Sequence, residues 1–241
     1  MAELMFYEKV VPLNDKVHAT LRVRPPAGFG YAAKTNSVPL LASESFDAAR
    51  EYPIVFARSP EGPVPAALLG LRDAENLYVG ADGKWDARYI PAFVRRYPFV
   101  PAKGPQGEMI VCIDEASPCF GTKEGEPLFV DGKPSPQLDH AMKFLSEFHN
   151  GVTVTDTLGK RLEALGLLRQ ADSVAQLHDG TQFRLNGLSV VDETKLRQLK
   201  PEAVQELFAN GSLGVIYAHL TSLGNLGALV DRLSRRNPPQ K

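Results

Sequence analysis

The sequence predicts an α+β protein in which an antiparallel-rich sheet packs with helices and the C-terminal part is more helical. Up to residue 135, short apolar runs alternate with glycine, proline and Asp-Gly turns, as expected for strands joined by local turns. From residue 136 onward, apolar residues recur at intervals of three and four, which indicates amphipathic helices. We therefore expect a single domain over 1–241, with a possible internal boundary near 136 between a β-rich part (1–135) and a helix-rich part (136–241).

The chain is expected to begin with a strand and a short helix. Residues 17–23 alternate apolar and polar side chains, which predicts a half-buried strand with His18 on its polar face. A surface histidine on a strand is the ordinary interpretation of such a position. A helix is then expected over 43–50, with Ser43 or Ser45 as its N-cap.

The strongest strand signals lie at 52–56, 64–71 and 108–114. The first two are apolar runs separated by a loop that contains glycine and proline, which predicts an antiparallel hairpin. The third, EMIVCID, is the most strand-like run in the chain. A shorter strand is expected at 128–130, followed by a turn at Asp131-Gly132.

An aromatic-rich segment lies between these strands, from residue 76 to residue 100. Residues 76–79 are expected to continue the sheet, and Asp82-Gly83 supplies a tight turn. Asp86 is placed to cap a helix. That helix should stop before Pro98, because the residue before a proline is driven out of the helical region.

The helix-rich part begins with a long amphipathic helix that ends near Gly166 and has a potential break at Asn150-Gly151. An Asp-Gly turn then predicts a β-hairpin over 174–185. Two short helices follow, the first capped by Asp192. The last helix is expected over 213–233, with an apolar stripe that docks on the protein; a helix that binds a partner is the alternative.

Composition excludes several classes of function. The chain has 27 Lys and Arg against 28 Asp and Glu, a net charge of −1, which gives no field that would attract nucleic acid. No window approaches the ~18 consecutive apolar residues of a membrane span. The N-terminal residues lack the basic and apolar regions of a secretory signal, so we expect a soluble, cytoplasmic protein.

No motif predicts a catalytic, metal or cofactor site. Glycine-rich nucleotide loops and nucleophile elbows are absent, and the five histidines show no i, i+4 pair. The spacing of Cys112 and Cys119 fits no common zinc pattern. Cys112 is expected to be a buried free thiol, whereas Cys119 lies in a loop and a disulfide between the two stays open. We therefore predict no catalytic residues, no metal and no cofactor.

The remaining candidates are binding residues in the aromatic-rich segment. Arginine beside aromatic rings makes a recognition surface through bidentate hydrogen bonds and cation–π contacts. The opposing interpretation is that the aromatics belong to the core and that the arginines close a helix favourably. The candidate binding residues are Trp85, Tyr89, Arg95, Arg96 and Tyr97, together with His18.

A series of segments in a fixed order resembles the SapC family of bacterial proteins over nearly the full length of the chain. These segments are VPLN (11–14) with His18, AAKTNSVPL (32–40), AREYPIVF (49–56), LLGL (68–71) with Asn76-Leu77, Trp85 with YIP (89–91) and RRYPF (95–99), CID (112–114), LF (128–129) with Gly132, and IYAHL (216–220) with SL (222–223).

The resemblance implies a role but no chemistry. The founding association of the family is with the export or assembly of a paracrystalline surface layer. Other members look like proteins encoded near TonB-dependent receptors and near flavoenzymes similar to tryptophan halogenases. The first expectation is a non-catalytic accessory or binding protein whose protein partner belongs to a surface-layer, secretion or outer-membrane receptor system. The alternative is an enzyme or peptide-modification partner that works with such a flavoenzyme or an oxygenase. The resemblance supplies no catalytic residues or cofactor, and the oligomeric state stays open.

Overall fold

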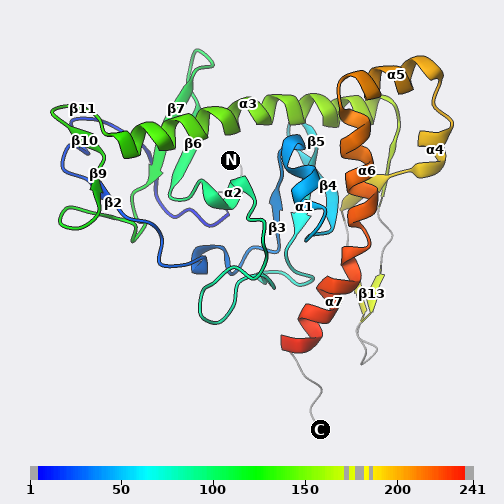
Figure 1. Ribbon diagram of the computed structural model, residues 1–241, viewed down its shortest axis with the longest axis horizontal. Helices are drawn as coiled ribbons and strands as arrows, with labels where there is room; N and C mark the ends of the chain where they lie inside the picture. The colour runs from blue at the N-terminus through cyan, green and yellow to red at the C-terminus, as the bar shows by residue number, and fades with distance from the viewer. Residues whose placement is uncertain (1–4, 171–173, 177–181, 185–186, 237–241) are drawn as a thin grey trace, which may run out of the picture.

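The computed structural model describes residues 5–170, 174–176, 182–184 and 187–236. Within these residues the main sheet has five strands that pair antiparallel, so the expected fold class is confirmed (Figure 1). The hairpin expected from the local turn signal is present, with Ile54 paired to Ala67 and Ser59 paired to Gly62. The strands lie in the order β12 (Leu168–Gln170), β15 (Leu188–Val191), β4 (Ile54–Ser59), β5 (Gly62–Leu68) and β3 (Ser37–Pro39).

Most of the smaller sheets lie toward the start of the long helix α3 (Pro136–Ala164), and one two-stranded pair lies at the opposite end of the molecule (Figure 1). One joins β1 (Val10–Pro12), β7 (Met109–Asp114) and β6 (Phe99–Lys103). A second joins β8 (Phe120–Gly121), β2 (Arg22–Val23) and β9 (Glu126–Pro127). Two-stranded pairs are formed by β10 (Phe129–Val130) with β11 (Lys133–Pro134), and by β13 (Val174–Gln176) with β14 (Gln182–Arg184). The last pair is the predicted hairpin, whose turn lies outside the described residues.

Helix α3 runs from the small sheets near its start to the main sheet near its end (Figure 1). Ser135 caps its start by accepting the Leu138 amide, and the helix continues through Asn150-Gly151, where the sequence had left a break open. Gly166, with φ +63°, follows its end as predicted. The shorter helices are η1 (Gly30–Ala32), η2 (Ala42–Glu44), α1 (Ser45–Ala48), α2 (Ala92–Arg95), α4 (Glu193–Arg197) and α5 (Pro201–Ala209).

The predicted final helix is two helices, α6 (Ser212–Ser222) and α7 (Asn225–Arg236). The break follows Leu223, and Asn225 donates hydrogen bonds from its side chain to the carbonyl oxygens of Ala49 and Tyr52. The bend between the helices is 41°. Along the described chain, no helix on its own combines the length and hydropathy of a bilayer-crossing segment, and only this bent pair reaches them jointly.

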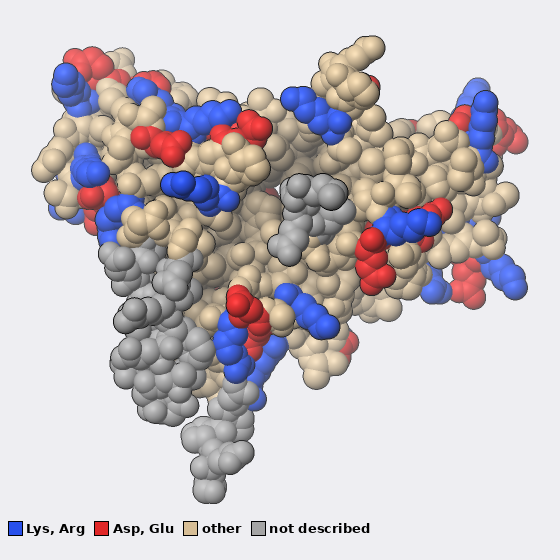
Figure 2. Space-filling model, turned by 180° about the vertical axis from the view of Figure 1, so that it is seen from behind, with Lys and Arg blue, Asp and Glu red and all other residues tan. Residues whose placement is uncertain are grey.

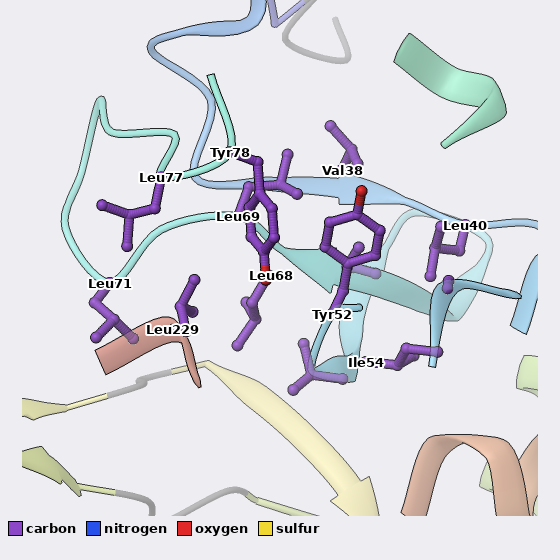
Figure 3. Packing of buried hydrophobic residues seen from close by; sticks show 14 of the residues in the cluster. Val38, Leu40, Tyr52, Ile54, Leu68, Leu69, Leu71, Leu77, Tyr78 and Leu229 are labelled. Atoms are coloured by element: carbon purple, nitrogen blue, oxygen red, sulfur yellow. The ribbon is translucent and has the colours of Figure 1, made fainter. Parts of the chain in front are cut away.

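The largest buried cluster lies between the main sheet, the aromatic-rich segment and α7. Figure 3 shows Tyr52 and Tyr78 among aliphatic side chains, with Leu229 of α7 packed at the same cluster. The rings of Tyr52 and Tyr78 meet edge to face at 4.7 Å. Side chains separated by about 180 positions in the sequence therefore share one core.

Three further local expectations were wrong. Residues 17–20 form turns and not a strand, and only Arg22–Val23 pairs, because Asn14 accepts the His18 amide at 2.9 Å and closes a turn there. Residues 76–79 do not join the sheet; Val79 makes only an isolated bridge to Trp85. Asp86 does not cap a helix, since α2 begins only after Pro91.

Candidate functional site

The candidate site is built around α2, which places Arg95 and Arg96 at the end of one helical turn. The buried carboxylate of Glu44 accepts a hydrogen bond from the Ala92 amide at 2.7 Å and so anchors the start of the helix. The chain leaves through Tyr97, which is buried, and enters β6. The two arginines are thus held on a short helix that is fixed at both ends.

Arg96 turns toward the interior and is covered by aromatic rings. Its guanidinium carbon lies 3.9 Å from the centre of the Phe93 ring and 4.9 Å from that of Phe148 on α3. Its Nε donates a hydrogen bond to the Tyr7 hydroxyl at 3.0 Å. Burial lowers the pKa of Arg96 from its usual value, an effect that Tyr7 opposes.

Arg95 is exposed and lies at the surface between α2 and α3. Its Nε donates a hydrogen bond to the Ile90 carbonyl oxygen at 2.9 Å, which fixes the base of the guanidinium. The guanidinium carbon is 5.3 Å from the centre of the Phe144 ring and 5.9 Å from that of Tyr89. Arg95 and Arg96 therefore both contact aromatic rings, but only Arg95 does so from the surface.

A cleft of about 400 Å³ lies between the end of α2, the segment that follows β2 and the first turns of α3. We call it the arginine cleft. Its apolar wall includes Phe99 of β6 and Phe144 and Leu145 of α3. Besides Tyr97, its charged or titratable side chains are Arg24, Arg95, Arg96, His140 and Glu126.

A larger cleft, of about 780 Å³, lies on the other side of Tyr97. Tyr97 lines both clefts, and its ring is stacked on Tyr31 with 4.0 Å between centres and 16° between planes. Asp114, which also lines the larger cleft, is buried and accepts the backbone amides of Glu8 and Lys9. That carboxylate is therefore occupied in holding the N-terminal segment.

Trp85 and Tyr89 belong to a hydrogen-bond chain behind α2. The indole nitrogen of Trp85 donates to the Tyr52 hydroxyl at 2.8 Å, and that hydroxyl donates to the Tyr89 carbonyl oxygen. The Tyr89 hydroxyl donates to Glu44, and burial raises the pKa of Tyr89. Trp85 is half-buried and packs against the main core, so its polar atom serves the fold.

His18 does not lie on the exposed face of a strand, as expected, but is buried in a turn. Its Nδ1 accepts the Asn14 amide at 2.9 Å, because the turn brings the two residues together. Its Nε2 has no hydrogen-bond partner among the described residues and lies 3.8 Å from a carboxylate oxygen of Glu115. His18 lines neither the arginine cleft nor the larger cleft.

The structure therefore brings four of the six predicted binding residues together around α2, namely Tyr89, Arg95, Arg96 and Tyr97. Of these four, Arg95, Arg96 and Tyr97 line the arginine cleft and Tyr89 does not. Sequence reasoning missed Arg24, His140 and Phe144, which also line it. The spacing of His140 and Phe144, four apart on α3, places them on one helix face. That signal was present in the sequence, but nothing local indicates that this face lies opposite Arg95.

The described residues offer little for acid–base, thiol or metal chemistry. No group of three or more His, Cys, Asp or Glu side chains among them could hold a metal ion. Cys112 and Cys119 are both free and buried, and burial raises the pKa of each thiol, which disfavours the reactive thiolate. His219 is fully buried and hydrogen-bonded through both ring nitrogens.

No curated protein and no solved structure matches the chain. The family model described as SapC matches residues 13–229, a span that contains α2, the residues that line the arginine cleft and every described strand except β1. The chain belongs to the SapC family.

Proposed function

We propose that this SapC-family protein is a non-catalytic accessory protein that acts from the cytoplasm in a bacterial surface-layer, secretion or TonB-dependent uptake system. Family membership supports the choice of system, through the associations that the resemblance implies. The binding surface is the α2 region, formed by Tyr89, Arg95, Arg96 and Tyr97, with Trp85 packed behind it.

The binding role rests on how the described polar side chains are used. Glu44, Asp114 and His219 are buried, and each bonds backbone groups of a neighbouring element, so none is free for a substrate. Arg95 and Arg96, by contrast, line a surface cleft and form no ion pair with a carboxylate of the described chain. A charged pair that the fold does not neutralise supports recognition of a partner.

No observation among the described residues favours the alternative, an enzyme or peptide-modification partner that works with a flavoenzyme similar to tryptophan halogenases or with an oxygenase. That role requires a cleft shared by His18, Trp85 and Arg95. Arg95 lines the arginine cleft, whereas Trp85 and His18 do not. The three side chains therefore do not converge on one substrate there.

In vivo cross-linking tests the proposal. A photo-cross-linking residue replaces Arg95 in the full chain, which is expressed in its native bacterium and irradiated. We expect a covalent adduct with a protein of a surface-layer, secretion or TonB-dependent system, identified by mass spectrometry, and recovery of the protein in the cytoplasmic fraction.

The matched control places the same residue at Arg235, which is exposed on α7 and lies outside the α2 region. Adducts with these components from the Arg95 position and not from Arg235 support the proposal. Identical adducts from both positions, or none with such components from Arg95, would rule out this surface as the docking site.

A further inference from the structure

The arginine cleft concentrates positive charge in a chain that is otherwise balanced. It is lined by three arginines and His140 against a single carboxylate, Glu126, whereas the whole chain has a net charge of −1. Arg24 is partly neutralised by Glu124 at 3.1 Å, outside the cleft lining. Other arginines are paired in the same way, for example Arg161 with Glu206 and Arg232 with Asp86.

Among the residues that the structure describes, Arg95 and Arg96 have no carboxylate partner of this kind, and each guanidinium is anchored at its Nε. Each guanidinium has its Nε bonded within the protein, Arg95 to the Ile90 carbonyl oxygen and Arg96 to the Tyr7 hydroxyl. The Arg95 side chain also interacts with the Tyr89 hydroxyl, and no carboxylate in the described part of the chain forms an ion pair with either guanidinium. A guanidinium has five N–H donors, so most of the donors on each arginine are unused. Anchoring at Nε also reduces the entropy lost when the free edge binds a ligand.

The rest of the cleft is apolar. Phe144 and Leu145 of α3, Phe99 of β6 and the Pro25-Pro26 segment line it. Its volume of about 400 Å³ falls in the range of pockets that hold small molecules or the end of a chain. A ligand for this site therefore needs a negative group for the arginines and an apolar body for the wall.

We propose that the arginine cleft binds a carboxylate that is attached to an apolar group, with Arg95 and Arg96 holding the carboxylate and Phe144 contacting the apolar group. The planar guanidinium fork matches a carboxylate in two parallel hydrogen bonds. His140, exposed on the same cleft, provides a further donor. The ligand is either a free organic acid or the C-terminus of a peptide, since both present this chemistry.

A singly charged carboxylate suits the cleft better than a phosphate or a nucleic acid. Glu126 also lines the cleft and repels a second negative charge. Nucleic acid requires an extended basic stripe. The face of the molecule shown in Figure 2 instead mixes basic and acidic side chains.

Calorimetric titration of the purified full chain tests the inference, with 4-phenylbutyrate as the free acid and 4-phenylbutyramide as its neutral match. A short peptide that ends in a free phenylalanine carboxylate, and the same peptide amidated, form the second pair. We expect at least one acid to bind. Its amide is expected to bind at least about 10-fold more weakly, because a charge-assisted hydrogen bond is lost. Which pair shows this difference identifies the source of the carboxylate.

Variants assign the binding to the cleft. Arg95→Gln is expected to weaken acid binding about 10-fold, and Arg235→Gln, on α7, is expected to leave it unchanged. Because Arg95 is exposed, its variant should fold, and the thermal midpoint checks this. Arg96→Lys keeps the charge but removes the fork, and should also weaken binding.

Three results would overturn the inference: equal affinity for acid and amide, unchanged acid binding in Arg95→Gln, or no measurable binding of either acid at millimolar concentration. The inference rests on the proposed function in one respect: both place binding at the surface that carries Arg95 and Arg96. Titration of the purified protein does not depend on a cellular system, and the cross-linking result does not depend on a small acid, so the two can fail separately.

Discussion

The imidazole of His219 joins two strands that are far apart in the sequence. Its Nδ1 donates a hydrogen bond to the Ile54 carbonyl oxygen at 2.8 Å, and its Nε2 accepts the Val191 amide at 3.0 Å. His219 falls in the segment 213–233, over which the sequence predicts a helix. Its hydrogen-bonding role could not be predicted, because Ile54 is 165 positions away.

Burial holds the pKa of His219 at about 4, below its ordinary value of 6.5. In the unfolded chain, the His219 imidazole therefore takes up a proton more readily than it does in the folded chain. The neutral imidazole of His219 contributes fully to the free energy of unfolding above about pH 6.5. This contribution, of up to about 3 kcal/mol, is lost as the pH falls toward 4. His219→Gln, which cannot titrate, should be less stable than wild type at pH 7 by about 1–3 kcal/mol.

Urea unfolding at pH 7 and at pH 4.5 measures this effect. The difference in unfolding free energy between wild type and His219→Gln is expected to narrow at the lower pH. His140→Gln, at an exposed position, is the control and should follow wild type at both values. A difference that stays constant with pH would contradict the assigned titration.

The candidate site could be predicted only as far as adjacency in the sequence allows. Arg95, Arg96 and Tyr97 are neighbours in the chain, so their grouping followed directly. His18 was misplaced because alternation over seven residues also occurs by chance, and the hydrogen bond that Asn14 accepts from the His18 amide decided the local structure. His140 enters the site through tertiary packing, which no local pattern encodes.

At the scale of elements, α3 packs closely against the main sheet because one of its residues is a glycine. A methyl group added at Gly159 would overlap the carbonyl oxygen of Pro63 on β5. Backbone cannot yield as a flexible side chain can, so helix and sheet would have to separate. Such overpacking typically costs about 1–3 kcal/mol and occasionally more.

Gly159→Ala is therefore expected to destabilise the protein by about 3 kcal/mol, although alanine is the better helix former. Gly227→Ala is the matched control, because Gly227 is exposed on α7 and a methyl group there meets nothing. It should raise stability by about 0.5–1 kcal/mol. Urea unfolding of both variants checks the prediction, and a gain in stability at Gly159 would show that the helix can shift without cost.

Elements with strong local signals were predicted well, and those fixed by tertiary contacts were not. The hairpin of β4 and β5 and the Asp192 cap of α4 follow from turn and capping chemistry. The break between α6 and α7 did not follow, because the apolar spacing continues across it. Asn225, which bonds carbonyl oxygens on the far side of the core, becomes informative only once the helix is docked.

At the scale of the whole molecule, the main sheet combines strands from both sides of residue 136. β15 pairs with β4, with Leu188 opposite Ala57. Leu229 and Leu233 of α7 are fully buried in the cluster that contains Tyr52. Pairings of such long sequence separation leave no local signal, so the strand order could not be predicted.

This shared core predicts that the chain unfolds in one cooperative transition. Trp85, the single tryptophan, belongs to residues 1–135 and packs against the shared core. Most of the far-ultraviolet circular dichroism instead comes from the helices that begin at residue 136 and beyond. Tryptophan fluorescence and the helical signal should therefore share one urea midpoint, because neither part retains a complete core alone. A fragment of residues 1–135 should accordingly remain unfolded, since it lacks β15, α3 and the α7 leucines. Separate midpoints, together with a folded 1–135 fragment, would instead place a domain boundary near residue 136.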